Sequence, residues 1–249
     1  MKKNKGYFLG FGLGSVDPKK YFGWSGKLLG TEPDIYLFAS KLKPLGYSTK
    51  KVLTKKATIE NFKLEIIKLS GKVKSNDLVV IVYSGHGGQI RDKSSDEIDG
   101  LDETYCFFNG EMTDDYMFEC LKLLPPCRVL MFSDACHSGT SYRNLTSNVP
   151  KFRSILNESS SISKASSTDE LQCSLKFFGA CHDEQVASDL GTNGLFTKIL
   201  WECIDRNPNV TWDELYNIVL GTMPEYQLPT YKTLGKINES FNKQSLFTI

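Results

Sequence analysis

Two stretches of the chain decide the fold: Leu78-Val-Val-Ile-Val-Tyr-Ser-Gly-His-Gly-Gly88 and Arg128-Val-Leu-Met-Phe-Ser-Asp-Ala-Cys-His-Ser-Gly139. Each begins as a largely apolar run, which is typical of a strand that is buried on both faces of a parallel sheet. Each then becomes polar and glycine-flanked, around His86 in the first stretch and Cys136 in the second. Because the chemistry of such sheets lies at the carboxyl ends of their strands, we expect His86 and Cys136 to emerge at the same edge of one sheet.

Outward from these strands, strand patterns alternate with helix patterns, which predicts an α/β protein with a mostly parallel sheet covered on both faces. Further strands are predicted at residues 7–12, 47–53, 104–108 and 175–180, and helices at residues 34–45, 59–71, 194–205 and 211–220 and after the capping residue Thr113. Residues 143–172 are rich in Ser and lack apolar periodicity. They predict a flexible loop within a single domain that spans residues 1–249.

The composition excludes several classes of partner. Lys and Arg number 30 against 29 Asp and Glu, which gives a net charge of +1. The composition therefore lacks the excess of basic residues that is typical of nucleic-acid-binding proteins, and we expect no such partner. The longest apolar run, residues 78–83, is far too short to span a bilayer, and we expect no membrane partner. The chain has seven cysteines, an odd number that disfavours a disulfide framework and favours a reducing compartment. Glycines interrupt the apolar segment near the N-terminus that a secretory leader would require. We therefore expect a cytoplasmic protein.

His86 and Cys136 have the residue types of a catalytic thiol–imidazole pair. A thiol nucleophile needs a nearby imidazole, which supplies thiolate character and later protonates the leaving amine. Glycines on both sides of His86 expose backbone N–H groups, and we name those of Gly87 and Cys136 as oxyanion donors. The alternative interpretation of each residue taken alone is that Cys136 is a small core residue and that His86 is a turn residue. Two glycine-flanked strand ends favour the catalytic interpretation.

Three longer motifs resemble those of one family. They are Tyr83-Ser-Gly-His-Gly-Gly-Gln89, Asp96-Glu-Ile-Asp-Gly-Leu-Asp-Glu103 and Ser133-Asp-Ala-Cys-His-Ser-Gly-Thr140. They resemble the core blocks of metacaspases and of bacterial orthocaspases, which are caspase-like cysteine peptidases, and the 50-position separation of His86 and Cys136 matches the caspase signature. The resemblance implies a caspase-like three-layer α/β/α sandwich and a Cys–His endopeptidase. It also implies protein or peptide substrates with Arg or Lys before the scissile bond.

The resemblance further assigns a primary specificity pocket. By motif position, Asp34, Ser84 and Asp134 match the residues that form this pocket in metacaspases. Asp134 stands where the caspase signature has Gln, two residues before the nucleophile. Two carboxylates suit a guanidinium group, which they can hold bidentately. The alternative for Asp34 is that it caps the helix predicted to begin there.

Calcium is another implication of the resemblance. Asp102, Asp114 and Asp115 stand where calcium-dependent relatives place ligands. A further ligand position of the family is Arg143 in this chain, and a cation there would oppose Ca²⁺. A solvated acidic loop explains the same carboxylates, so calcium is one of two interpretations. No other cofactor is expected.

The predicted loop over residues 143–172 carries basic side chains that fit such a pocket, and Arg153 and Lys164 are the candidate sites of self-cleavage. An extended Ser-rich segment can enter a protease cleft, but a linker that is never cut explains the same composition. The rival interpretation of the whole protein is a catalytically silent, caspase-like binding or regulatory protein, because a fold alone does not establish catalysis. The presence of both His86 and Cys136 favours the enzyme.

Overall fold

The computed structural model describes residues 4–91, 101–135, 171–181 and 187–249, and it is built around a six-stranded sheet in the order β2-β1-β3-β7-β8-β9. The strands are β1 (Gly6–Gly12), β2 (Ser48–Leu53), β3 (Leu78–Ser84), β7 (Arg128–Asp134), β8 (Ser174–Gly179) and β9 (Thr230–Gly235). All pair in parallel except β9, which runs antiparallel to β8. The prediction of a mostly parallel sheet is confirmed.

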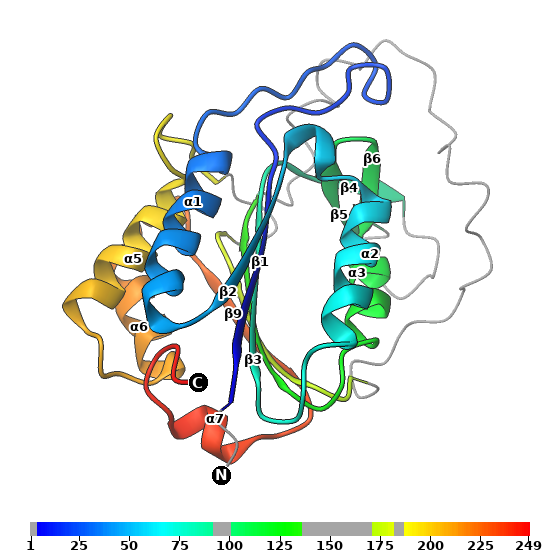
Figure 1. Ribbon diagram of the computed structural model, residues 1–249. Coiled ribbons are helices and arrows are strands. Elements are labelled where there is room, and N and C mark those ends of the chain that lie inside the picture. The colour runs from blue at the N-terminus through cyan, green and yellow to red at the C-terminus, as the bar shows by residue number, and fades with distance from the viewer. Residues whose placement is uncertain (1–3, 92–100, 136–170, 182–186) are drawn as a thin grey trace.

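Helices cover both faces of this sheet and give the molecule three layers (Figure 1). They are α1 (Thr31–Leu42), α2 (Ile59–Ser70), α3 (Asp114–Leu121), α5 (Leu195–Arg206), α6 (Trp212–Thr222) and the short α7 (Glu239–Lys243). In Figure 1, α1, α5 and α6 lie on one face, and α2 and α3 lie on the other. This arrangement confirms the α/β/α sandwich.

A second, smaller sheet follows β3 in the chain. It consists of β4 (Gly87–Arg91), β5 (Leu101–Phe107) and β6 (Gly110–Thr113), which pair antiparallel. The strand predicted at residues 104–108 belongs to this sheet. The sequence did not predict β4, β6, β9 or α7, because β4 begins with two glycines and the other three elements are short and largely polar.

Helix caps explain where the helices begin. The hydroxyls of Thr58 and Thr113 each accept a hydrogen bond from the backbone N–H three residues later, as predicted for α2 and α3. The helix predicted at residues 34–45 is present as α1, but its predicted start was wrong, because the helix begins at Thr31, three residues earlier, and Gly30 precedes it without a side-chain cap. Asp34 therefore lies within the first turn of α1 and is not its capping residue.

The strands alternate their side chains between two apolar cores. On β3, the odd-numbered residues from Val79 to Tyr83 belong to the core beneath α2 and α3. The even-numbered apolar residues of β3 belong to the core beneath α1, α5 and α6, and β7 alternates in the same way. Because successive side chains of a strand point to opposite faces, Ser84 and Asp134 at the ends of β3 and β7 face the side of α1 and α5.

Two glycines in β1 allow α1 to lie close to the sheet. A Cβ atom on Gly10 would lie 2.6 Å from Ile35 Cγ2, and one on Gly12 would lie 2.9 Å from the carbonyl oxygen of Thr31. Neither contact is tolerable, so the approach of α1 requires residues without a side chain at these positions. This close approach brings Asp34 within reach of the end of β3.

No helix in the described ranges is long and apolar enough to cross a membrane. The six described cysteines are all buried, and none of the six is in a disulfide. Burial raises the pKa of Cys120 and of Cys173 to about 11, so both remain protonated at neutral pH. These two thiols therefore have the character of core residues rather than of nucleophiles.

Candidate active site

Three polar side chains from three elements meet at the carboxyl edge of the main sheet. β3 and β7 pair so that Ser84 lies opposite Asp134, and α1 places Asp34 beside the end of β3. Ser84 Oγ donates a hydrogen bond of 2.7 Å to Asp34 Oδ2. Both carboxylates are buried, with 0% of Asp34 and 6% of Asp134 exposed. The structure thus brings together the three residues that were predicted to form the specificity pocket.

The amino end of α5 holds both carboxylates. Asp34 Oδ1 accepts hydrogen bonds of 2.8 Å from Asn193 Nδ2 and 3.0 Å from the Gly194 N–H. Asp134 Oδ2 accepts bonds of 3.0 and 2.7 Å from the N–H and the hydroxyl of Thr197. The N–H groups at a helix amino end have no partner within the helix, and the helix dipole favours negative charge there. The start of α5 is therefore an anchor for two acidic side chains.

Sequence reasoning missed Asn193, Gly194 and Thr197 as site residues. They stand at the start of the helix predicted at residues 194–205, where Asn, Gly and Thr are ordinary helix-entry residues. Their partners lie 159, 160 and 63 positions earlier in the chain. A local pattern shows that a helix begins here, but it does not show which carboxylates the helix meets.

Burial raises the pKa of both aspartates. For Asp34, burial acts together with repulsion from Asp134, and hydrogen bonds from its neighbours only partly offset the two effects. For Asp134, burial likewise outweighs the two hydrogen bonds from Thr197. Two carboxylates that share one buried site are difficult to ionise together, so the pair becomes fully ionised only at a higher pH than two exposed carboxylates would.

His86 lies in the chain between β3 and β4. Its carbonyl oxygen accepts hydrogen bonds from the Cys106 N–H at 2.9 Å and from the Tyr83 hydroxyl at 2.7 Å. Its Nε2 lies 3.1 Å from the carbonyl oxygen of Gly26. Since a carbonyl oxygen only accepts, this bond assigns the hydrogen to Nε2 and leaves Nδ1 as the nitrogen that can take up a proton.

The surroundings of the imidazole favour its neutral form. Burial lowers the pKa of His86 below the ordinary 6.5, against the opposing effects of the Gly26 carbonyl and of Asp189. The indole ring of Trp24 packs against the imidazole, with ring centroids 4.6 Å apart and an interplanar angle of 57°. A neutral imidazole at neutral pH is the form that acts as a general base.

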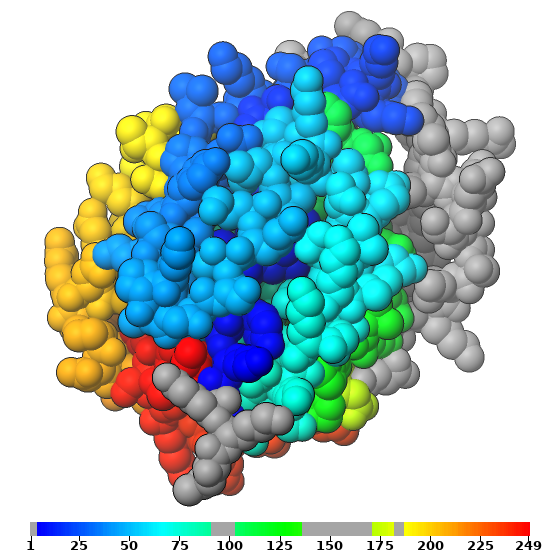
Figure 2. Space-filling model, in the orientation of Figure 1, coloured from blue at the N-terminus to red at the C-terminus, as the bar shows by residue number. Residues whose placement is uncertain are grey.

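Asp189 fastens the loop before α1 to the segment before α5. Its Oδ2 accepts hydrogen bonds from the N–H groups of Leu29 at 2.8 Å and Gly30 at 3.2 Å, and its Oδ1 accepts one from Gly191 at 2.8 Å. In Figure 2 the yellow surface of the segment that begins at residue 187 adjoins the blue surface of α1 and the loop before it. Asp189 therefore ties together the two segments that carry Asp34 and the start of α5. It was not predicted.

Cys136 lies outside the described residues, two positions beyond Asp134 in the sequence. The strand ends that precede the two candidate catalytic residues are held together, since the Gly85 N–H donates a bond of 3.2 Å to the carbonyl oxygen of Asp134. The pairing of Cys136 with His86 remains a prediction.

Two further groups of predicted residues remain untested. Gly87 opens β4, where it lies opposite Tyr105, and its role as an oxyanion donor remains a prediction. Arg153 and Lys164, the candidate self-cleavage sites, lie outside the described residues together with most of the loop predicted at residues 143–172.

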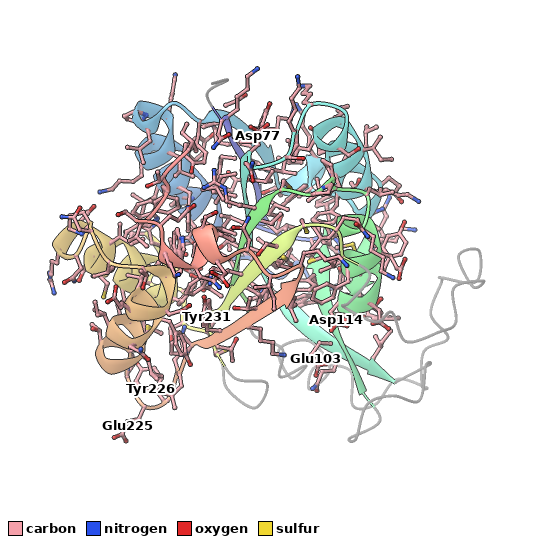
Figure 3. The ribbon with its side chains drawn as sticks, turned by 90° about the horizontal axis from the view of Figure 1, so that it is seen from below. Asp77, Glu103, Asp114, Glu225, Tyr226 and Tyr231 are labelled. Atoms are coloured by element: carbon pink, nitrogen blue, oxygen red, sulfur yellow. The ribbon has the colours of Figure 1, made fainter. Side chains whose placement is uncertain are left out.

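Asp114 and Asp115, two of the predicted calcium ligands, lie in the first turn of α3. The Asp115 N–H donates a hydrogen bond of 2.9 Å to Asp114 Oδ1. Figure 3 shows Asp114 beside α3, on the other side of the molecule from Tyr226. The side chain of Asp102 lies outside the described part of the chain, and within that part no three His, Cys, Asp or Glu residues are grouped to hold a metal ion. Ca²⁺ takes about 6–8 oxygen ligands. The described residues do not supply them, and calcium remains a prediction from the resemblance.

Comparison with protein families and with curated proteins gives consistent matches. The family model described as "Caspase domain" matches residues 16–240. Metacaspase-1 of Schizosaccharomyces pombe is 29% identical in a match that covers 59% of this chain and 46% of that protein. Metacaspase-1 of Meyerozyma guilliermondii is 34% identical over 49% of this chain and 33% of that protein. The chain thus spans less than half the length of these two relatives.

Comparison with solved structures extends the match to nearly the whole chain. A protein of Geobacter sulfurreducens is 32% identical, with a TM-score of 0.86 over 98% of this chain and 99% of that one. Caspase-1 of Spodoptera frugiperda is 12% identical with a TM-score of 0.60, covers 94% of this chain and 88% of that one, and is similar in fold alone. The resemblance inferred from the motifs around His86 and Cys136 is therefore confirmed, and the chain belongs to the caspase-domain family.

Proposed function

We propose that this protein is a cysteine endopeptidase that uses Cys136 and His86 and cleaves peptide bonds after Arg or Lys. The observation that carries the proposal is the buried carboxylate pair, Asp34 and Asp134, at the sheet edge from which His86 emerges. A buried pair of like charges is unfavourable unless a cation joins it, and a substrate with Arg or Lys supplies that cation. Membership of the caspase-domain family supports the peptidase chemistry.

In the proposed reaction, His86 Nδ1 takes the thiol proton of Cys136 as the sulfur attacks the substrate carbonyl carbon. The negative charge on the carbonyl oxygen is expected to meet the N–H groups of Gly87 and Cys136. The imidazole then gives its proton to the departing amine, which leaves a thioester. A water molecule that loses a proton to His86 hydrolyses the thioester and restores the thiol. The Gly26 carbonyl supports these steps because it keeps the hydrogen on Nε2.

We assign the direct contact with the substrate cation to Asp134 and a supporting role to Asp34. The hydrogen bonds that described residues donate to Asp134 end on Oδ2, which makes Oδ1 the oxygen that we assign to the cation. Both oxygens of Asp34 already accept hydrogen bonds. An acidic substrate side chain would add another negative charge to the buried pair, so cleavage after Asp is not expected.

The test uses a set of fluorogenic peptides that differ only in the residue before the reporter group, which is Arg, Lys, norleucine or Asp. Norleucine has nearly the aliphatic length of Lys without its charge and controls for size. We expect cleavage after Arg and Lys, and a loss of several orders of magnitude in Cys136→Ala and in His86→Ala. Cys203→Ala, which changes a buried free thiol of α5, is the matched control and should keep its activity.

Two outcomes would contradict the proposal. Preferential cleavage after Asp would overturn the assignment of the pocket. A folded wild-type chain that cleaves none of the peptides would indicate a caspase-like binding protein, which is the rival interpretation.

A further inference from the structure

The loop before α1 packs an aromatic ring onto the imidazole of His86. The Trp24 and His86 ring centroids lie 4.6 Å apart, and the indole is only partly buried. Trp24 packs against a small cluster of Val16, Tyr21 and Cys106 that is separate from the two main cores. The reaction proposed above gives the indole no role, and its position outside the main cores leaves its contact with His86 to be explained.

The backbone around Trp24 is shaped so that its ring and a nearby carbonyl reach the same imidazole. Phe22, Gly23 and Gly26 have positive φ angles of 55°, 91° and 51°. A Cβ atom on Gly26 would lie 2.8 Å from Trp24 Cη2, so the indole also excludes any larger residue there. With glycine at this position, the carbonyl oxygen of Gly26 approaches His86 Nε2 to 3.1 Å. The strain at Phe22 shows that the surrounding structure imposes this conformation.

Both partners of the contact are fixed to the same strand. The Tyr21 hydroxyl donates a hydrogen bond of 2.6 Å to the carbonyl oxygen of Phe107 in β5, and Tyr21 is buried. The preceding residue of β5, Cys106, donates its N–H to the carbonyl oxygen of His86 at 2.9 Å. The loop that carries Trp24 and the backbone of His86 are therefore held at a set separation by β5.

We propose that Trp24 is a positioning residue for His86, because its indole ring and the Gly26 carbonyl together hold the imidazole so that Nδ1 serves as the general base. The proposal rests on the proposed function, in which His86 is the general base. A tilted indole packed against the imidazole and a hydrogen bond at Nε2 together oppose rotation about both side-chain torsions of His86. Since a misplacement of about 1 Å can cost about 100-fold in rate, the effect belongs to kcat rather than to KM.

The indole also shields the imidazole from water. Burial lowers the pKa of His86, while the Gly26 carbonyl and the Asp189 carboxylate, from the segment before α5, act in the opposite direction. The Tyr83 hydroxyl faces the carbonyl oxygen of His86 rather than its ring. Removal of the indole exposes the ring to water, so the pKa of His86 is expected to rise toward 6.5.

The kinetic test compares Trp24→Leu, Trp24→Phe and Gly26→Ala in the full chain with the Arg-ended peptide. We expect Trp24→Leu to lower kcat by about 10- to 100-fold with little change in KM, and Trp24→Phe to restore most of that loss because it keeps an aromatic ring. Gly26→Ala drives a methyl group against the indole and should behave like Trp24→Leu. The matched control is Trp201→Leu, which removes a buried tryptophan of α5 and should lower Tm without changing kcat per folded molecule.

A spectroscopic test separates this proposal from the proposed function. The chain has three histidines, and their imidazoles can be titrated by NMR in a Cys136→Ala background, where no thiol at position 136 couples to His86. We expect a higher pKa of His86 in Trp24→Leu than in its parent, and a value near the parent's in Trp24→Phe. An unchanged pKa together with an unchanged kcat would overturn the role of Trp24. A raised pKa in a chain whose parent cleaves no peptide would support the packing role and refute the proposed function.

Discussion

At the residue scale, Asp34 and Asp134 meet two opposed requirements. Burial raises the pKa of each carboxylate, so the charged pair is unfavourable within the folded chain. The proposed function requires that same charge when the substrate cation arrives. Hydrogen bonds from Ser84 and from the start of α5 reduce the cost without removing it. Such a conflict between local stability and chemistry is characteristic of functional sites.

This conflict predicts a pH dependence of substrate affinity. Below their raised pKa values the two aspartates hold protons and attract a cation weakly, and above them both are ionised. We expect KM for the Arg-ended peptide to rise several-fold as the pH falls from about 8 to about 5. Because burial lowers the pKa of His86, the imidazole stays neutral over much of this range, and the change appears in KM before kcat. Steady-state kinetics across the range provide the measurement, and a constant KM would contradict a protonated pocket.

The same pKa shift predicts that Asp134→Asn is more stable and less active than the wild type. A raised pKa in the folded state gives stability that is full below the unfolded-state pKa and is lost as the pH rises through the folded-state pKa. We therefore expect a higher Tm than wild type at about pH 8 and an equal Tm near pH 4. Loss of the charge should lower kcat/KM for the Arg-ended peptide by about 100-fold or more.

Thermal denaturation at the two pH values and peptide kinetics check both parts of this prediction. Asp34→Asn is the companion variant, and its loss of kcat/KM should be smaller because Asp34 supports the pocket without direct contact with the substrate cation. A Tm that falls equally at both pH values would show that Asp134 stabilises the fold and is not a strained buried charge.

At the element scale, the amino end of α5 joins residues from separate parts of the chain into one pocket. Asn193 and Gly194 reach Asp34 on α1, and Thr197 reaches Asp134 at the end of β7. A Cβ atom on Gly194 would overlap the carboxylate of Asp134, so the helix can approach this closely only with glycine at the capping position before Leu195.

Gly194→Ala is therefore expected to disturb the pocket while the fold remains intact. The added methyl group must displace the Asp134 carboxylate, and we expect KM for the Arg-ended peptide to rise by about 10-fold or more. Gly221 in α6 is the matched control, because a Cβ atom there meets nothing within 4 Å. Gly221→Ala should keep its kinetic constants and gain about 0.5–1 kcal/mol of stability. Measurements of peptide kinetics and of Tm for both variants test this prediction. Equal kinetic constants in Gly194→Ala and Gly221→Ala would contradict it.

The elements that the sequence predicted are those with a strong local pattern. The apolar runs of β3 and β7 and the threonine caps of α2 and α3 indicate their structure within a few residues. The short strands β4, β6 and β9 carry glycine or polar residues and have no apolar period. The pocket residues were named through the resemblance, whereas the contacts of Asn193 and Trp24 depend on how distant segments pack. No local pattern contains that information.

At the scale of the whole molecule, the three layers separate stability from chemistry. Apolar cores fill both faces of the sheet, and the pocket and His86 lie at the carboxyl edge, opposite the end at which both chain termini lie in Figure 1. Substitutions at this edge are therefore expected to change activity with less effect on stability than substitutions of core residues.

Self-cleavage is the prediction that concerns the whole chain. The loop predicted at residues 143–172 begins seven positions after Cys136 and contains Arg153 and Lys164, which fit the proposed pocket. Overnight incubation of wild type and Cys136→Ala, followed by intact-mass analysis, is expected to give fragments that end at one of these residues in the wild type alone. An intact chain in both, from a preparation that cleaves peptide, would show that activity needs no cut in this loop.

The central claim, a Cys136 nucleophile served by a pocket for Arg or Lys, is tested most directly by covalent labelling. Two peptidyl acyloxymethyl ketones with one shared sequence, ending in Arg or in Asp, alkylate a thiolate only after their terminal side chain has bound. The account predicts one adduct per chain with the Arg-ended reagent, on Cys136 and on none of the other cysteines, and little with His86→Ala or Asp134→Asn. Equal labelling by the Asp-ended reagent, or an adduct on another cysteine, would contradict it.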